Sequence, residues 1–224
     1  MGPSTSSPNW RNAAQLVDAR DTVHAIAFAP RHMGLRIATA SADGFVRMYE
    51  AIDVLNLSHW PLQEEFLGHV NGVTCLAWNP SILDVPMVVL GADKNATVWA
   101  YHTSLHRWQT VTSLVGHSES VLDVSWAPQL GRSYHVIATA SKDHTLRIWK
   151  LKWSTTDNVP TITVETICIG KHDGAEVWRV EWNVTGTMLT SSGDDGSVRM
   201  WKRDFEGTWI CVNTIVGQVP TDAP

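Results

Sequence analysis

The strongest constraint on the fold is a sequence segment that recurs four times along the 224 residues of the chain. In every copy an aromatic residue follows a valine by five positions, and an aspartate precedes a tyrosine or tryptophan by six. The valines are Val23, Val73, Val121 and Val177, and the aspartates are Asp43, Asp93, Asp143 and Asp195. Two fixed spacings in four copies indicate a repeat architecture, in which each repeat is one structural unit.

The repeats have the pattern of β-strands rather than helices. β-branched and aromatic residues form short runs, and Gly, Pro, Asp or Asn closes each run. Turns such as Ala42-Asp43-Gly44 indicate hairpins between antiparallel strands. An extended segment that begins with tryptophan recurs between the repeats, and the predicted outer strands are 10–17, 60–67, 108–115 and 209–216. Segment 161–169 takes this role before the fourth repeat, after a predicted polar loop at 154–160.

These strands are combined with Gly-His pairs at Gly68-His69 and Gly116-His117, each followed by a tryptophan about thirty residues later. This combination is typical of WD repeats, which form the blades of a β-propeller. We therefore predict an all-β WD-repeat β-propeller that forms an open partial arc of four blades, with segment 10–17 as one surplus N-terminal strand. The predicted propeller spans 10–217, with blades at 20–67, 68–115, 116–169 and 170–216, between disordered segments 1–9 and 218–224.

The recurring histidines and aspartates admit a structural and a catalytic interpretation. An aspartate in a hairpin turn can accept a hydrogen bond from a histidine ring, which in turn bonds a serine or threonine and the strand tryptophan. Since the pair recurs in successive repeats, whereas an active site is normally unique, we predict a structural role. The predicted structural residues are His69, His117, Asp43, Asp93, Asp143, Asp195, Tyr49, Trp99, Trp149 and Trp201. Arginines two positions before the blade aromatic are predicted to be solvated, namely Arg47, Arg147 and Arg199.

Sequence motifs for the common chemistries are absent. The chain contains no G-x-S-x-G, G-x-G-x-x-G, Walker or H-E-x-x-H motif, and its three cysteines are widely spaced. We therefore predict no catalytic, cofactor-binding or metal-binding residues. The net charge of −5, without runs of like charge, argues against direct nucleic-acid binding. No apolar run approaches the ~18 residues of a transmembrane segment.

Several segments are more specific than a generic WD repeat. They include FAPRHMGL at 28–35 and SSGDDG at 191–196, together with 38–51, 53–60, 126–128, 130–133 and 176–187. In these segments the chain closely resembles the Sec-thirteen-homologue nucleoporins, the Seh-one type of WD protein. The resemblance extends over nearly the whole chain and includes loop sequences as well as blade cores.

This resemblance implies a non-enzymatic scaffold subunit. The family forms six-bladed open propellers, which are completed by a blade that an elongated helical scaffold nucleoporin supplies in trans. Such proteins join other outer-ring nucleoporins in the Y-shaped subcomplex of the nuclear pore at the nuclear envelope, which serves mRNA and protein transport. A second pool joins a SEA-type complex at the vacuolar or lysosomal membrane surface, which regulates TOR signalling. The chain then corresponds to the last four of six blades.

Two other classes of protein remain as alternatives. The first is a COPII vesicle-coat WD propeller of the sister type, although the loops at Met33-Gly34 and 57–60 favour the nucleoporin. The second is a propeller enzyme, for example a hydrolase. In the nucleoporin family the inserted blade packs beside the last blade, so the resemblance implies partner-binding residues in the final strand, namely Trp209, Ile210 and Val212.

Overall fold

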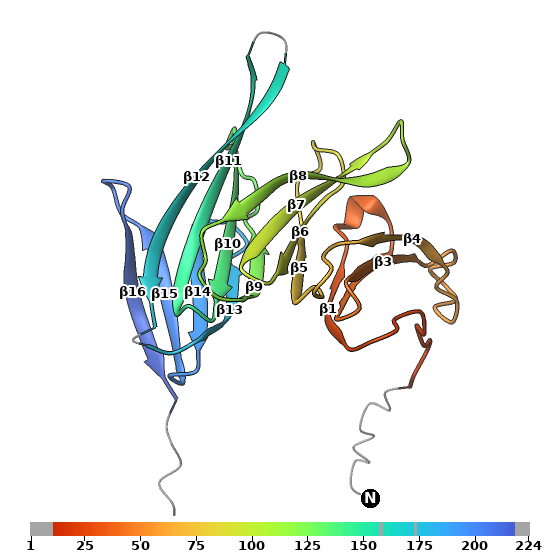
Figure 1. Ribbon diagram of the computed structural model, residues 1–224, viewed down its shortest axis with the longest axis horizontal. Helices are drawn as coiled ribbons and strands as arrows, with labels where there is room; N and C mark the ends of the chain where they lie inside the picture. Colours follow the sequence, from red (N-terminus) through yellow and green to blue (C-terminus); the bar gives the residue numbers. More distant parts are fainter. Residues whose placement is uncertain (1–10, 157–158, 173, 218–224) are drawn as a thin grey trace, which may run out of the picture.

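The computed structural model describes residues 11–156, 159–172 and 174–217. Sixteen strands form four antiparallel sheets of four strands each, and in every sheet the strands neighbour one another in chain order. The sheets stand side by side as the blades of an arc whose first and fourth blades lie at opposite ends (Figure 1). The prediction of an all-β, open arc of four blades is therefore confirmed. The described residues contain no helix with the length and apolar character needed to span a bilayer.

Each blade consists of a first, innermost strand and three further strands. The first blade contains β1 (Val23–Phe28), β2 (Arg36–Ser41), β3 (Phe45–Glu50) and β4 (Leu62–Leu67), with a 3-10 turn at Arg31–Met33. The second contains β5 (Cys75–Trp78), β6 (Met87–Ala92), β7 (Asn95–His102) and β8 (Arg107–Val115). The third contains β9 (Val121–Trp126), β10 (His135–Ser141), β11 (Thr145–Thr156) and β12 (Val159–Lys171). The fourth contains β13 (Val177–Trp182), β14 (Met188–Gly193), β15 (Ser197–Arg203) and β16 (Trp209–Val216).

Two local predictions are wrong. Residues 11–17 form no strand, because a strand needs a hydrogen-bonded neighbour and no sheet precedes β1 in the described part of the chain. The polar loop predicted at 154–160 is largely strand, since β11 reaches Thr156 and β12 begins at Val159. This hairpin projects beyond the other blades in Figure 1. The predicted disordered segments, 1–9 and 218–224, lie outside the described residues.

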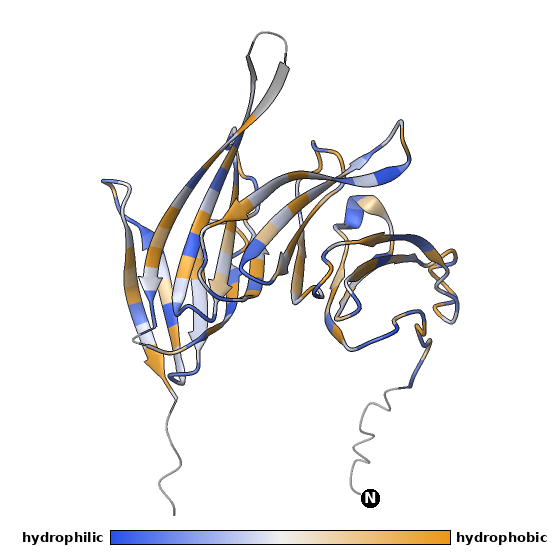
Figure 2. Cartoon of the chain, in the orientation of Figure 1, coloured by the Kyte–Doolittle hydropathy of each residue, from blue (hydrophilic) through white to orange (hydrophobic). Residues whose placement is uncertain are grey.

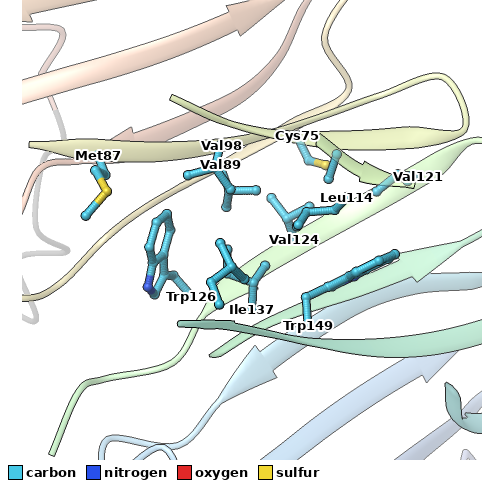
Figure 3. Close-up of a cluster of buried hydrophobic side chains, with 12 residues drawn as sticks. Cys75, Met87, Val89, Val98, Leu114, Val121, Val124, Trp126, Ile137 and Trp149 are labelled. Carbon is cyan, nitrogen blue, oxygen red and sulfur yellow. The ribbon is translucent and has the colours of Figure 1, made fainter. Parts of the chain in front are cut away.

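The blades are held together by a hydrophobic core in each of the three seams between neighbours. Side chains alternate between the two faces of a strand, so one face of an inner blade packs on the preceding blade and the other on the following one. In the central seam, Met87 and Val89 of the second blade face Trp126, Ile137 and Trp149 of the third (Figure 3). Hydrophobic segments run along the strands of all four sheets (Figure 2).

In two of the three seams, the tryptophan that ends the first strand of a blade donates a hydrogen bond to the preceding blade, whereas Trp126 Nε1 in the central seam has no partner within the described chain. Trp78 Nε1 donates to the Ala27 carbonyl of the preceding blade at 3.3 Å, and Trp182 Nε1 donates to the Ser125 carbonyl at 3.2 Å. Because both acceptors stand directly before the corresponding aromatic of the neighbouring blade, the contact is repeated by the fold. The exposure of the aromatic residue that ends the first strand therefore indicates whether another blade packs before that blade.

Candidate protein-interaction site

The third blade contains a complete hydrogen-bonded network around a buried histidine. His117 Nδ1 lies 2.9 Å from Asp143 Oδ2, and His117 Nε2 lies 2.6 Å from Thr139 Oγ1. Trp149 Nε1 donates to the same Thr139 oxygen at 2.9 Å. In a neutral ring, Nδ1–H donates to the carboxylate and Nε2 accepts from the threonine hydroxyl. The network ties the connection between β8 and β9 to the hairpin turn and to the blade tryptophan.

The electrostatics of this network favour a neutral histidine beside a charged aspartate. Burial lowers the pKa of His117, and the neighbouring Asp143 only partly opposes this effect. Burial alone would raise the pKa of Asp143, but hydrogen bonds from Thr145, the Ser118 N–H and His117 lower it to about 2. The Asp143 contribution to stability is therefore present above about pH 4 and is lost as the pH falls towards 2.

The lowered pKa of His117 predicts a loss of stability in mild acid. The unfolded chain takes up a proton near the ordinary value of 6.5, before the folded chain does, so stability is full above this pH and falls below it. The pKa of His135 is also lowered by burial, with the same consequence. Below pH 6.5 the free energy of unfolding of the wild type should fall as the pH falls. In the His117→Gln variant this slope should be smaller by up to about 1.4 kcal/mol per pH unit. Urea unfolding across this range measures both slopes, and equal slopes would contradict the assignment.

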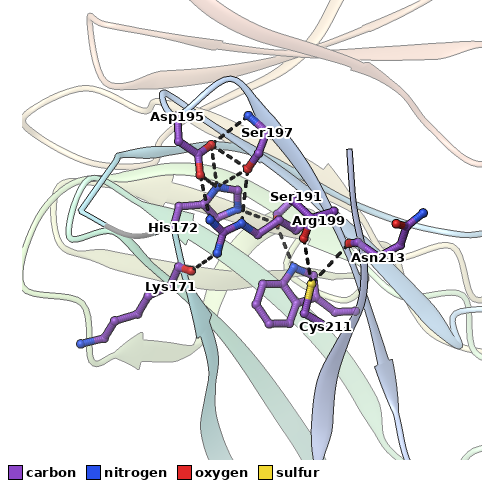
Figure 4. A network of polar contacts seen from close by, with 10 residues as sticks. Lys171, His172, Ser191, Asp195, Ser197, Arg199, Cys211 and Asn213 are labelled. Atoms are coloured by element: carbon purple, nitrogen blue, oxygen red, sulfur yellow. Dashed lines mark hydrogen bonds and ion pairs between the residues drawn. The ribbon is translucent and has the colours of Figure 1, made fainter. Parts of the chain in front are cut away.

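The fourth blade contains the same network, in which the predicted residues Asp195 and Trp201 are joined by His172, a histidine outside the predicted set. His172 Nδ1 lies 3.1 Å from Asp195, His172 Nε2 lies 2.9 Å from Ser191 Oγ, and Trp201 Nε1 donates to Ser191 Oγ at 2.9 Å (Figure 4). His172 was not among the predicted residues because it stands one position away from the usual Gly-His spacing, after Gly170-Lys171. The sequence does signal this histidine, because Lys171-His172 is a shifted counterpart of Gly-His and His172 precedes Trp201 by 29 residues.

In the second blade, the predicted partners His69 and Asp93 do not form a hydrogen bond with each other. The His69 ring accepts a hydrogen bond from the Asn71 N–H at 3.2 Å, and Asp93 adopts a left-handed backbone with φ 48° in an exposed turn. The reason lies at Val89, which occupies the position of Thr139 and offers no hydroxyl to a histidine ring. Trp99 Nε1 donates instead to Thr97 Oγ1, two residues earlier in its own strand, at 2.9 Å.

The first blade replaces the histidine by an arginine. Arg47 pairs with Asp43 at 2.9 Å and with Glu65 at 2.6 Å, and its side chain is 1% exposed. The prediction that Arg47 is solvated is therefore wrong. Ala19 stands at the sequence position of the histidine, and Arg47 pairs with Asp43 instead. Burial raises the pKa of Tyr49 to about 12, and a hydrogen bond with Asp18 adds to the rise.

The networks have the geometry of structural supports. Both nitrogens of the His117 and His172 rings already face protein groups, and the same arrangement occurs in two neighbouring blades. The carboxylates are occupied by backbone N–H and hydroxyl donors as well. Within the described residues, no group of three or more His, Cys, Asp or Glu side chains could hold a metal ion.

The first blade presents an uncovered face at one end of the arc. Phe28 occupies the position of Trp78, Trp126 and Trp182, and it is 65% exposed, whereas these three tryptophans are 5–8% exposed. Ile26 on the same strand is also exposed. The described chain places no blade before β1 to cover these side chains.

The fourth blade presents the second uncovered face. Ile210 and Val212 of β16 are 45% and 46% exposed, and Ile215 is exposed as well. Trp209, by contrast, turns towards the core, where its ring lies 5.7 Å from that of Trp182. β16 is also the outermost strand of its sheet, and Figure 2 shows hydrophobic segments along it. Exposed apolar sheet faces of this kind are typical of protein-interaction sites.

Four antiparallel four-stranded sheets with repeated seam contacts define the class: this is a WD-repeat propeller arc. The comparison with known families agrees, since the family "WD domain, G-beta repeat" matches residues 108–150 and 164–202. The chain is 38% identical over 221 residues to "Nucleoporin SEH1-A" of Xenopus laevis, and 39% identical over 223 residues to "Nucleoporin SEH1" of both Homo sapiens and Danio rerio. Each alignment covers 93% of this chain.

The chain is therefore a homologue of the SEH1 nucleoporins, and the resemblance inferred from its loops is confirmed. It spans about 61% of the length of the curated relatives that it matches. The first and fourth blades of this arc are the ones with uncovered faces.

Proposed function

We propose that this chain is a non-enzymatic scaffold subunit of the nuclear pore complex at the nuclear envelope, where it supports transport of mRNA and protein. The observation that carries the proposal is the pair of uncovered blade faces in a homologue of SEH1 nucleoporins. A scaffold acts by binding partners, and the exposed apolar side chains at both ends supply the area for such contacts. The histidine networks support a structural role, because both ring nitrogens of His117 and of His172 already face protein groups.

The partner at the fourth blade is a blade supplied in trans by a helical scaffold nucleoporin of the outer-ring Y-shaped subcomplex. Ile210 and Val212 offer exposed apolar contacts, whereas Trp209 supports them from the core side. This face also differs from the inner seams: Thr190 and Ser192 stand where the third blade has the buried residues Ala138 and Ala140. A face with added hydroxyl groups suits a partner that brings its own polar groups, rather than another blade of this chain.

The proposal predicts loss of partner capture when the fourth-blade face is charged. We expect the Ile210→Asp/Val212→Asp double variant to recover outer-ring nucleoporins from nuclear extracts at least about tenfold less well than the wild type, because two buried apolar contacts would become unpaired charges. Affinity purification with quantitative mass spectrometry measures the recovery.

The matched control is Leu55→Asp/Val184→Asp, which adds the same charge at exposed apolar side chains of two loops. The control should recover the nucleoporins as the wild type does and should localise to the nuclear rim. Localisation to endoplasmic reticulum exit sites would favour the vesicle-coat alternative. Recovery of SEA-type subunits through the same face would extend the proposal to the TOR-regulating complex.

A further inference from the structure

A pocket of about 420 Å³ lies in the seam between the second and third blades. Asp84 and Val85 line it from the loop before β6, and His135 and Trp153 line it from β10 and β11. This volume falls in the range of sites that enclose a side chain or small ligand. The pocket is remote from both uncovered blade faces, so its role is independent of the proposed scaffold contacts.

The carboxylate of Asp84 is held in place but not neutralised. Asn79 Nδ2 donates to Asp84 Oδ2 at 3.2 Å, whereas His135 Nε2 lies 3.7 Å from this oxygen, beyond hydrogen-bond length. Among the described residues, Asp84 Oδ1 accepts no hydrogen bond, and no lysine or arginine nitrogen lies within ion-pair distance of the carboxylate. The pocket therefore contains a fixed negative charge that lacks a cation.

His135 does not supply the missing charge. Burial lowers its pKa and Asp84 only partly opposes this, so the ring is neutral at neutral pH. Its Nδ1 is buried and has no hydrogen-bond partner within the described chain. The ring instead packs edge-to-face on Trp126 and Trp153, with centroids at 5.6 Å and 4.6 Å. Trp153 is 36% exposed and thus keeps part of its indole surface available.

The corresponding pocket in the next seam has the opposite character. It has a volume of about 370 Å³ and lies between the third and fourth blades. Lys150 stands there at the position of Ala100 of the second blade. Three further cations line the pocket, namely Arg132, Lys202 and Arg203, against a single carboxylate, Glu165, which pairs with Lys150 at 3.1 Å. Negative charge is therefore not a general property of inter-blade pockets in this fold but belongs to the seam that contains Asp84.

We infer that the pocket between the second and third blades binds an arginine side chain of a basic peptide segment, with the guanidinium paired to Asp84 and packed against Trp153. A guanidinium is the cation that both pairs with a carboxylate through two N–H groups and stacks on an aromatic ring. Leu83 and Val85 are 90% and 50% exposed beside the carboxylate, and they provide apolar contacts for the peptide residues that flank the arginine. The net charge of −5 favours a basic partner over long range.

The test uses a fluorescein-labelled peptide, Gly-Ser-Leu-Arg-Val-Ser-Gly, and its counterpart with citrulline in place of arginine. Citrulline keeps the shape of arginine and removes its charge, so the wild-type chain should bind the arginine peptide at least about tenfold more tightly in a fluorescence anisotropy titration. The Asp84→Asn variant should bind both peptides with equal affinity. The Trp153→Ala variant should weaken binding of the arginine peptide about three- to tenfold.

Matched controls carry the same chemical changes elsewhere on the surface. Glu206→Gln removes a carboxylate from an exposed turn, and Trp178→Ala removes an exposed tryptophan, and both should bind as the wild type does. Equal wild-type affinity for the two peptides would overturn the inference without need of any variant. Retention of the preference for arginine by a folded Asp84→Asn variant would overturn it as well.

Discussion

Replacement of Trp149 with alanine is expected to lower the free energy of unfolding by about 3–5 kcal/mol, the typical cost of removing a buried tryptophan. Trp149 is 1% exposed and packs in the seam between the second and third blades, where Met87, Val89 and Trp126 belong to the same core. The substitution leaves a cavity in this seam and also removes the donor to Thr139 Oγ1. Urea unfolding monitored by circular dichroism measures the change.

The control for this prediction is Trp178→Ala, which deletes the same side chain where it is 45% exposed on β13. Its cost should stay below about 1 kcal/mol, because little packing is lost at an exposed position. A loss below about 1 kcal/mol for Trp149→Ala would show that the seam between these two blades does not stabilise the fold as a packed core.

Substitution of Thr139 with valine is expected to cost about 2–6 kcal/mol, although valine has nearly the same shape as threonine. The change leaves two buried nitrogens, His117 Nε2 and Trp149 Nε1, without their common partner, and each such loss costs about 1–3 kcal/mol. In the second blade, where valine occurs naturally, the tryptophan uses Thr97 instead. The third blade has Arg147 at that position, and a guanidinium cannot accept a hydrogen bond.

Thr39→Val is the matched control, because Thr39 occupies the same position in the first blade. No histidine faces it there, and within the described chain its hydroxyl has no side-chain hydrogen bond, so the expected cost is below about 1 kcal/mol. Thermal and urea unfolding of both variants test the difference. Equal costs for the two substitutions would mean that the hydrogen-bonded network adds nothing beyond the packing of a β-branched side chain.

The repeat spacing predicted most of the fold because it reports the local chemistry of each strand. The alternation of apolar residues and the aspartate-containing turns identified the inner strands, and the final strand was predicted with the bounds that the structure shows, Trp209–Val216. The surplus strand at 10–17 failed for a different reason. An extended pattern is local, but a strand exists only when a neighbouring ladder satisfies its backbone groups.

The sequence alone determined the class of the protein, the number of blades in this chain and the position of the first-strand tryptophan that packs in each seam. Only the tertiary structure decided which polar residues are partners: Asp143 meets its histidine, Asp93 does not, and Arg47 is buried with two acids. The physical reason is that a buried hydrogen bond depends on the side chain across the sheet, which spacing along one strand does not specify. The pocket between Asp84 and Trp153 likewise exists only because two blades pack side by side.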